Sequence, residues 1–300
     1  ITLGQDIDLA PLSDLFDSWQ SFESTSAEQI VERCHDAQFI ITNKVVLTES
    51  VLTALPQLKV IGVAATGTNN IDVECANKLG IDVVNVKGYG DQSVAQHTFM
   101  LLLQLIGRAR PYQAYIDNKN WPKSAFFSCL DFTTYELQGK TLGIVGYGGL
   151  GQAVANIARA FGMSIIIAER PNRDIVREGR VSFEVLLKHS DVVSLHCPLT
   201  TDNQHIIDEN ALALMKPSAL LLNTARGPLV DEQALLNALM NNSIAGAALD
   251  VLSQEPPPPN HPLLSYQGDN LIITPHIAWA AKEARQRLVI MLANNLSKYL

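Results

Sequence analysis

The feature that most constrains this chain is a glycine-rich turn, Gly146-Tyr147-Gly148-Gly149-Leu150-Gly151, which stands between two kinds of periodicity. An apolar run, Leu142 to Val145, precedes the turn and is typical of a buried strand. An amphipathic stretch, Gly149 to Phe161, follows and predicts a helix. A G-x-G-x-x-G turn in this context predicts a dinucleotide-binding unit.

Each position of the turn has a physical role in such a unit. Gly146 would permit the tight turn, and Gly148 would let a pyrophosphate approach the backbone. Gly151 would let the helix pack closely on the strand. The first helical residues, Gly149 and Leu150, would offer unpaired N–H groups and the positive end of the helix dipole to the phosphates. We expect these five residues to bind the cofactor.

An acidic residue at the end of the next strand decides between NAD and NADP. Glu169 stands there, directly after Ser164 to Ala168 and 18 residues beyond Gly151. A carboxylate at this place accepts the ribose hydroxyls and repels a 2′-phosphate, so Glu169 favours NAD. The neighbouring Arg170 weakens this preference, because a guanidinium can accommodate that phosphate.

Strands and helices alternate through most of the chain, which predicts an α/β fold with parallel sheets. The first series of strands is expected at 37–41, 59–64 and 81–84. The second series has six strands, as a doubly wound dinucleotide fold requires, at 142–146, 164–168, 191–196, 219–223, 244–250 and 271–274.

Two lobes follow from this alternation. Gly88-Tyr89-Gly90 separates the two series, and a long helix, Gln92 to Arg108, ends near Pro111. The last helix, 282–300, has no strand after it, so we expect it to return to the first lobe. The prediction is a Rossmann doubly wound NAD-binding domain, 91–279, inserted in a flavodoxin-like substrate domain, 1–90 and 280–300.

Composition excludes several classes of protein. The 300 residues carry 22 Lys and Arg against 30 Asp and Glu, a net charge of −8 without any basic run, so nucleic acid and anionic membranes are poor partners. The most apolar run, Phe99 to Ile106, is far shorter than the roughly 20 residues that span a bilayer. The four cysteines have neither CxxC nor zinc-like spacing. We therefore expect a cytoplasmic protein without a metal, and we expect a first strand and a C-terminal tail outside the given sequence.

Three polar residues follow successive strands of the second series. Arg226 follows the strand 219–223, Glu255 follows 244–250, and His276 follows 271–274. Because parallel strands end at one edge of the sheet, all three should lie on the same side as the glycine turn, where ligands of such folds bind. His97, on the long helix, is expected to pack at an interface or hinge.

With these residues, the chain resembles the D-isomer-specific 2-hydroxyacid dehydrogenases over nearly its whole length. Besides the glycine turn, the similarity includes Ala65-Thr66-Gly67-Thr68-Asn69-Asn70-Ile71-Asp72, His196-Cys197-Pro198-Leu199-Thr200, Asn223-Thr224-Ala225-Arg226-Gly227, Ala248-Leu249-Asp250-Val251 and Pro275-His276-Ile277-Ala278-Trp279. The resemblance implies that Arg226, Glu255 and His276 form the catalytic set. It also implies that Cys197, Pro198, Thr224, Ala225 and Asp250 line the nicotinamide and adenosine sites.

The residue types suit hydride transfer to a 2-keto acid. His276 as imidazolium can protonate the keto oxygen, and Glu255 would stabilise that charged ring. Arg226 offers a planar fork to the substrate carboxylate or carbonyl. The Thr66-Gly67 turn would add backbone donors to the same carboxylate, and Trp279 would wall the pocket. Thr66 is also expected beside the cofactor.

Within this family, the Trp279 segment and the Thr66-Gly67 turn are most similar to glycerate dehydrogenases, also called hydroxypyruvate reductases. The expected reaction is therefore hydroxypyruvate to D-glycerate, in a homodimer. A D-lactate dehydrogenase, a glyoxylate reductase or a dinucleotide-sensing corepressor would be compatible with the same residues.

Overall fold

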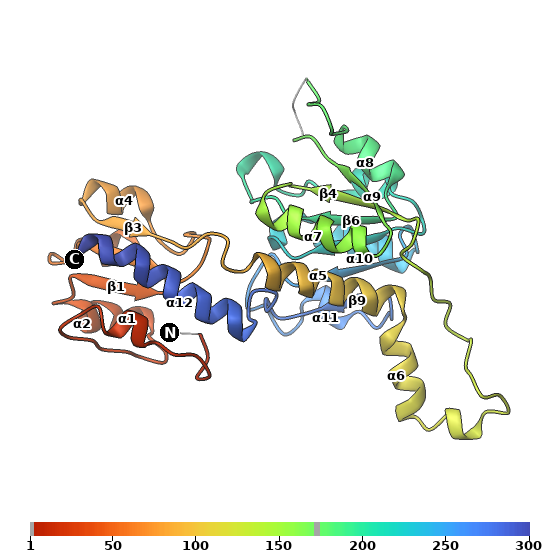
Figure 1. Ribbon diagram of the computed structural model, residues 1–300, viewed down its shortest axis with the longest axis horizontal. Coiled ribbons are helices and arrows are strands. Elements are labelled where there is room, and N and C mark those ends of the chain that lie inside the picture. Colours follow the sequence, from red (N-terminus) through yellow and green to blue (C-terminus); the bar gives the residue numbers. More distant parts are fainter. Residues whose placement is uncertain (1–2, 171–174) are drawn as a thin grey trace. The chain divides into compact units, whose positions relative to one another are not determined.

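A computed structural model describes residues 3–170 and 175–300. The chain divides into two compact units, Ile1–Ser93 with Trp279–Leu300 and Val94–Ala278. The chain therefore passes from one unit to the other at two places, 93/94 and 278/279. Figure 1 shows the elements of both units, each of which is described below by itself.

The first unit is built on a three-stranded parallel sheet, in the order β1-β2-β3. The central strand is buried on both faces, because alternate residues enter two different cores. Val60 packs with α12, and Ile61 packs with α3 and α4. The elements are α1 (Ala10–Ser13), α2 (Ile30–Cys34), β1 (Phe39–Thr42), α3 (Glu49–Thr53), β2 (Val60–Val63), α4 (Val73–Lys78), β3 (Asp82–Val84) and α12 (Lys282–Leu296).

The second unit contains a six-stranded parallel sheet, in the order β5-β4-β6-β7-β8-β9. The order reverses between β4 and β6, which is the switch point where doubly wound sheets bind ligands. Its strands are β4 (Thr141–Val145), β5 (Ser164–Ile167), β6 (Val192–Leu195), β7 (Leu220–Asn223), β8 (Gly246–Leu249) and β9 (Leu271–Ile273).

Helices cover both faces of this sheet. One apolar core joins one face to α5 (Asp91–Ile106) and α7 (Gly149–Ala160). The other core joins the opposite face to α8 (Phe183–His189), α9 (Glu209–Leu214), α10 (Glu232–Met240) and α11 (Pro262–Ser265). The predicted α/β architecture with a Rossmann domain is confirmed.

One expectation about the helices is wrong. Pro111 does not end the helical region, since it lies in the first turn of a further helix, α6 (Ala109–Asp117). A proline is tolerated there, because the first N–H groups of a helix have no intrahelical partner. The break lies at Arg108, whose φ of 52° is left-handed and separates α6 from α5. The segment after α6 is irregular except for one short 3-10 turn, Trp121–Lys123.

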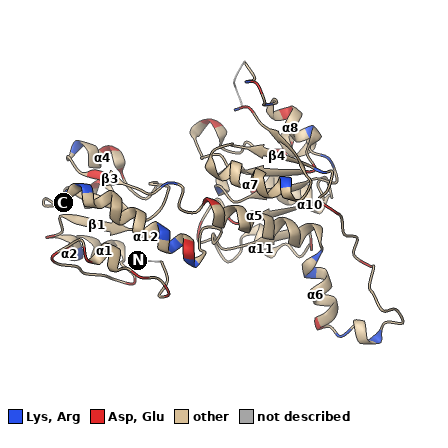
Figure 2. Cartoon of the chain, in the orientation of Figure 1, with Lys and Arg blue, Asp and Glu red and all other residues tan. Residues whose placement is uncertain are grey.

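Lys, Arg, Asp and Glu residues are scattered along the elements of both units rather than gathered on one of them (Figure 2). Within residues 3–170 and 175–300, no helix combines the length and the apolar character that a bilayer crossing requires. The same residues contain no cluster of three His, Cys, Asp or Glu side chains suited to a metal ion.

Candidate active site

The glycine turn has the geometry that its sequence predicts. Gly146 adopts a φ of 97°, and a Cβ there would lie 2.5 Å from the backbone nitrogen of Cys197, so only glycine fits. A Cβ on Gly151 would strike the carbonyl oxygen of Gly146. Glycine at this position therefore allows the helix to lie close to the strand. Gly148, by contrast, faces open space at the N-cap of α7.

This combination fits a dinucleotide pyrophosphate. The open space at Gly148 lies beside the start of a 12-residue helix, whose first N–H groups have no intrahelical acceptor. Those N–H groups and the helix dipole would hold the phosphates. Gly148, Gly149 and Leu150 are therefore the residues that would cradle the pyrophosphate.

The predicted ribose-binding acid has a partner that the sequence analysis missed. Glu169 is only 2% exposed, and its carboxylate is held by the guanidinium of Arg177, through bonds of 2.7 Å from Nε and 2.6 Å from Nη2. The pairing with Arg177 holds the pKa of Glu169 far below its ordinary value. The four arginines between positions 170 and 180 were the only sequence signal for such a pair.

The ends of β7, β8 and β9 are level, since Asn223 pairs with Leu249 and Leu249 with Ile273. Arg226 follows β7 in a turn that the Asn223 side chain shapes, by donating to the Arg226 carbonyl and accepting from the Ala225 N–H. The next residue, Gly227, touches the backbone of Leu252, where any Cβ would collide. The Arg226 turn is thus packed against the segment that leads to Glu255.

Arg226 is half-buried, and its Nη1 donates to the Ala225 carbonyl at 2.7 Å. Among the described residues its guanidinium has no carboxylate partner. A half-buried cation of this kind is suited to a carboxylate that arrives with a ligand.

Glu255 and His276 are in direct contact. Oε2 of Glu255 lies 2.6 Å from Nδ1 of His276, and Oε1 accepts the Leu252 N–H at 3.0 Å. Both side chains are about one-third exposed, at 35% and 27%. His276 itself has a φ of 55°, a left-handed conformation that is rare for a non-glycine residue and clusters at functional sites. The geometry fixes the ring by its Nδ1 side.

Asp250, at the end of β8, organises the segment that carries His276. Its carboxylate accepts hydrogen bonds from the Thr274 hydroxyl and from the Ile277 and Ala278 N–H groups, at 2.5, 2.9 and 2.8 Å. Burial alone would raise the pKa of Asp250, but these donors and His97 outweigh burial and lower the pKa.

His97 belongs to this group, which the sequence analysis did not foresee. Its Nε2 lies 3.0 Å from the Thr274 hydroxyl and 3.4 Å from Oδ1 of Asp250, and its side chain is 11% exposed. The helical pattern placed His97 on α5. It did not indicate which strand end the side chain would contact, because His97 and Asp250 are 153 positions apart in the sequence.

Other predicted cofactor residues line the same edge. Thr224 is buried and bonds through its hydroxyl to that of Thr98, 3.1 Å away, and Ala225 is buried beside it. Cys197 follows β6, where burial raises the pKa of its thiol, and Pro198 follows it, exposed. Next to them, His196 bonds to Ser194 at 2.8 Å through Nε2.

The remaining predicted residues belong to the first unit. The Thr66 hydroxyl donates to the Val86 carbonyl at 3.0 Å, and the Thr66 carbonyl accepts from the Asn85 amide at 2.6 Å. These bonds hold the turn that contains Gly67. Trp279 is partly buried against the core around α12. The substrate roles of Thr66, Gly67 and Trp279 stay predictions.

A Rossmann unit with a Glu–His pair and an arginine at adjacent strand ends defines a nicotinamide-dependent oxidoreductase. Residues 99–278 match the family described as D-isomer specific 2-hydroxyacid dehydrogenase, NAD binding domain. The chain belongs to the D-isomer-specific 2-hydroxyacid dehydrogenases and is an NAD-dependent enzyme, as its sequence predicts.

Named relatives are similar over most of their length. The glycerate dehydrogenase of Methylorubrum extorquens is 43% identical over 282 residues, covering 94% of this chain and 88% of that protein. The hydroxypyruvate reductase of Blautia hydrogenotrophica is 38% identical over 279 residues, covering 92% and 86%. Among solved structures, D-lactate dehydrogenase from Aquifex aeolicus, complexed with NAD and lactic acid, aligns with a TM-score of 0.79 at 32% identity, covering 90% and 84%.

Proposed function

We propose that this enzyme reduces hydroxypyruvate to D-glycerate with NADH. The relatives named glycerate dehydrogenase and hydroxypyruvate reductase support this substrate. So does the similarity of the Thr66-Gly67 turn and the Trp279 segment to that group of enzymes. Bound NAD supplies the hydride chemistry, and the chain's own residues bind the keto acid and move the proton.

His276 is the proposed general acid. In the direction of reduction, C2 of the keto acid gains a hydride and negative charge develops on the keto oxygen. That oxygen accepts a proton from Nε2 of the imidazolium ring. In oxidation the neutral ring takes that proton back. Arg226 would hold the substrate carboxylate, with the backbone at Thr66-Gly67 as a second anchor, and Trp279 would wall the pocket.

The contact of 2.6 Å between Oε2 of Glu255 and Nδ1 of His276 carries this proposal. A carboxylate that bonds to Nδ1 fixes the orientation of the ring and leaves Nε2 to exchange the proton. The nearby Arg226 turn supplies the cation that a 2-keto acid requires.

A panel of 2-keto acids tests the substrate. NADH oxidation would be followed with hydroxypyruvate, glyoxylate and pyruvate at matched concentrations. We expect the highest kcat/KM for hydroxypyruvate. A higher value for pyruvate would favour D-lactate dehydrogenase activity, the name that the Aquifex aeolicus neighbour carries, and a higher value for glyoxylate would make the enzyme a glyoxylate reductase.

We further propose that the enzyme is a homodimer of the cytoplasm. All four cysteines are unpaired, as a reducing compartment requires. Helix α6 and the segment that follows it, up to residue 135, form an arm that projects from the sheet of their unit (Figure 1). They expose large apolar side chains, which mark a protein interface. These are Trp121 (51% exposed), Phe126 (76%), Phe127 (92%), Leu130 (84%) and Tyr135 (63%).

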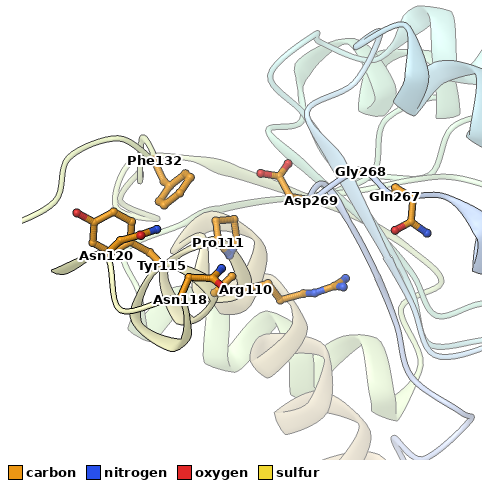
Figure 3. Close-up of a pocket in the computed structure, with 10 residues that line it drawn as sticks. Arg110, Pro111, Tyr115, Asn118, Asn120, Phe132, Gln267, Gly268 and Asp269 are labelled. Carbon is orange, nitrogen blue, oxygen red and sulfur yellow. The ribbon is translucent and has the colours of Figure 1, made fainter. Parts of the chain in front are cut away.

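A second copy would cover this arm. At its base a hollow of about 390 Å³ is lined by residues of α6, by Phe132 and by Asp269 (Figure 3). None of the predicted catalytic residues lines it, so it is suited to a partner side chain rather than to the reaction. Phe127→Glu with Leu130→Glu should convert the dimer to a monomer in sedimentation experiments. A wild-type chain that sediments as a monomer at micromolar concentration would refute the dimer.

A further inference from the structure

The end of β5 holds an ion pair whose chemistry bears on cofactor choice. Glu169 stands where a dinucleotide fold places the acid that binds the adenosine ribose. In this chain the carboxylate accepts four hydrogen bonds. Oε1 accepts from the Arg170 N–H at 2.8 Å and from Nη2 of Arg177 at 2.6 Å. Oε2 accepts from Nε of Arg177 at 2.7 Å and from the Arg177 N–H at 3.2 Å.

These four bonds use the whole capacity of the group. An ionised carboxylate has about four lone-pair sites, and the guanidinium occupies two of them with its bidentate fork. Because the pKa of Glu169 is held far below its ordinary value, chiefly by Arg177, the pair stays ionised and carries no net charge. The repulsion that an acid at this place normally exerts on a 2′-phosphate is thereby cancelled.

The charges around the pair favour an anion. The Arg170 side chain is exposed and forms no ion pair with any described residue, while Arg180 donates to the Ala168 carbonyl at 3.0 Å. Glu178 is the one anionic side chain in the described part of this segment apart from Glu169. The guanidinium of Arg177 is itself 48% exposed and is accessible to a ligand.

We propose that Arg177 neutralises Glu169 and thereby makes the adenosine end of the cofactor site tolerant of a 2′-phosphate, so that the enzyme binds NADPH as well as NADH. The inference rests on the predicted position of Glu169 beside the adenosine ribose. A phosphate monoester carries about two negative charges near neutral pH, so its binding responds strongly to the loss of one nearby cation. NADH has no such group.

An alternative role for the pair is purely structural. The segment after Arg177 folds back on β5, where the Glu169 N–H donates to the Val181 carbonyl at 2.7 Å and the Val181 N–H donates to the Ile167 carbonyl at 2.9 Å. Arg177 would then only pin this segment to the strand. A structural role predicts equal losses for both cofactors, whereas neutralisation predicts a change in their ratio.

Fluorescence titration of the full chain with NADH and with NADPH, without keto acid, separates these roles. For the wild type we expect dissociation constants within about tenfold of each other. Arg177→Ala exposes the carboxylate and should raise the ratio of the NADPH constant to the NADH constant at least tenfold. Arg177→Gln removes only the charge and should act in the same direction, which protects the test if the alanine variant folds poorly.

The double variant Arg177→Ala/Glu169→Gln is decisive. With the acid gone, the missing cation no longer matters, so the ratio should return to within about threefold of the wild-type value. Lys188→Ala removes a cation from an exposed position on α8 and should leave the ratio unchanged. A wild-type ratio above 100, an unchanged ratio in both Arg177 variants, or no recovery in the double variant would overturn the proposal. Because no substrate is present, the result does not depend on which keto acid is reduced.

Discussion

Asp250 and Ala278 are joined by a hydrogen bond of 2.8 Å, from the Ala278 N–H to Oδ2 of a carboxylate that is 1% exposed. Ala278 is the last residue before the chain leaves the NAD-binding unit. His97, which contacts the same carboxylate, is the fourth residue of that unit. One buried charge at the end of β8 therefore ties together the segments at both crossings, and His276 lies in one of them.

We predict that Asp250→Asn impairs catalysis and stability together. The NH2 group of the asparagine amide cannot accept a hydrogen bond, so at least one of the two N–H groups that bond to the carboxylate loses its partner. This loss should cost about 1–3 kcal/mol in the free energy of unfolding. The His276 segment would shift, which should lower kcat by about tenfold to a hundredfold. Denaturant unfolding and steady-state kinetics measure both effects. Asp269→Asn, at a half-exposed ion pair, is the control and should change neither by much.

Replacement of His276 by Asn should separate binding from turnover. The variant loses its general acid, so kcat for keto-acid reduction should fall by about 10²–10⁴. Its dissociation constant for NADH should stay within about twofold of the wild-type value, because the glycine turn is untouched. Turnover at the wild-type rate on every accepted keto acid would eliminate His276 as the proton donor.

Removal of the carboxylate from Glu255 should lower turnover. Oε2 of Glu255 lies 2.6 Å from Nδ1 of His276 and orients the ring. In Glu255→Gln the ring is held less firmly in the orientation that proton transfer requires, so kcat for keto-acid reduction should fall by about tenfold to a hundredfold. The dissociation constant for NADH should stay within about twofold of the wild-type value.

Steady-state kinetics together with NADH titration distinguish this effect from a loss of cofactor binding. Glu184→Gln, the same substitution on the exposed face of α8, should leave both quantities unchanged. If Glu255→Gln turns over at the wild-type rate, Glu255 does not position His276 for the reaction.

His196 should make the folded chain sensitive to acid. Its Nδ1 is buried without a hydrogen-bond partner among the described residues, and burial lowers the pKa of the ring from 6.5 to about 4. The unfolded chain gains this proton below about pH 6.5, whereas the folded chain gains it only near pH 4. Between these values stability should fall with falling pH, by about 1.4 kcal/mol per pH unit from this group.

The variant His196→Gln removes that titration and keeps a polar group opposite Ser194. We expect its free energy of unfolding to fall less steeply than that of the wild type between pH 6.5 and 4, whatever its stability at pH 8. Parallel curves for the two proteins would mean that His196 does not contribute.

Most of the fold was predictable because its determinants are local. Apolar runs of four to seven residues marked each of the nine strands in the described part of the chain to within two or three residues. Ser182, Asp208 and Asp231 are residue types that favour helix starts, and each caps the backbone of the helix that follows it. Helix α6 was missed because Pro111 could follow the end of one helix or lie in the first turn of the next, and the sequence does not distinguish these two positions. The left-handed Arg108 that separates α5 from α6 has no signature of its own.

The site residues were predictable for a different reason. Parallel strands bring their carboxyl ends to one edge, so the positions of Arg226, Glu255 and His276 after three strands were enough to place them there. The glycine turn was recognisable because its backbone admits no side chain at Gly146 and Gly151. These are properties of neighbouring residues and of sheet topology, which the order of amino acids contains.

By itself, then, the sequence determined the alternating elements, the dinucleotide turn and the strand ends that carry polar residues. Only the tertiary structure decided which side chains share a hydrogen bond. The Arg177–Glu169 pair and the His97–Asp250 contact depend on where separate segments meet and on rotamers chosen by packing. Hydrophobic periodicity reports which face of an element is buried, but not which polar group will lie opposite. For that reason the sheet edge that carries the candidate site could be predicted from the chain, and the electrostatics around it could not.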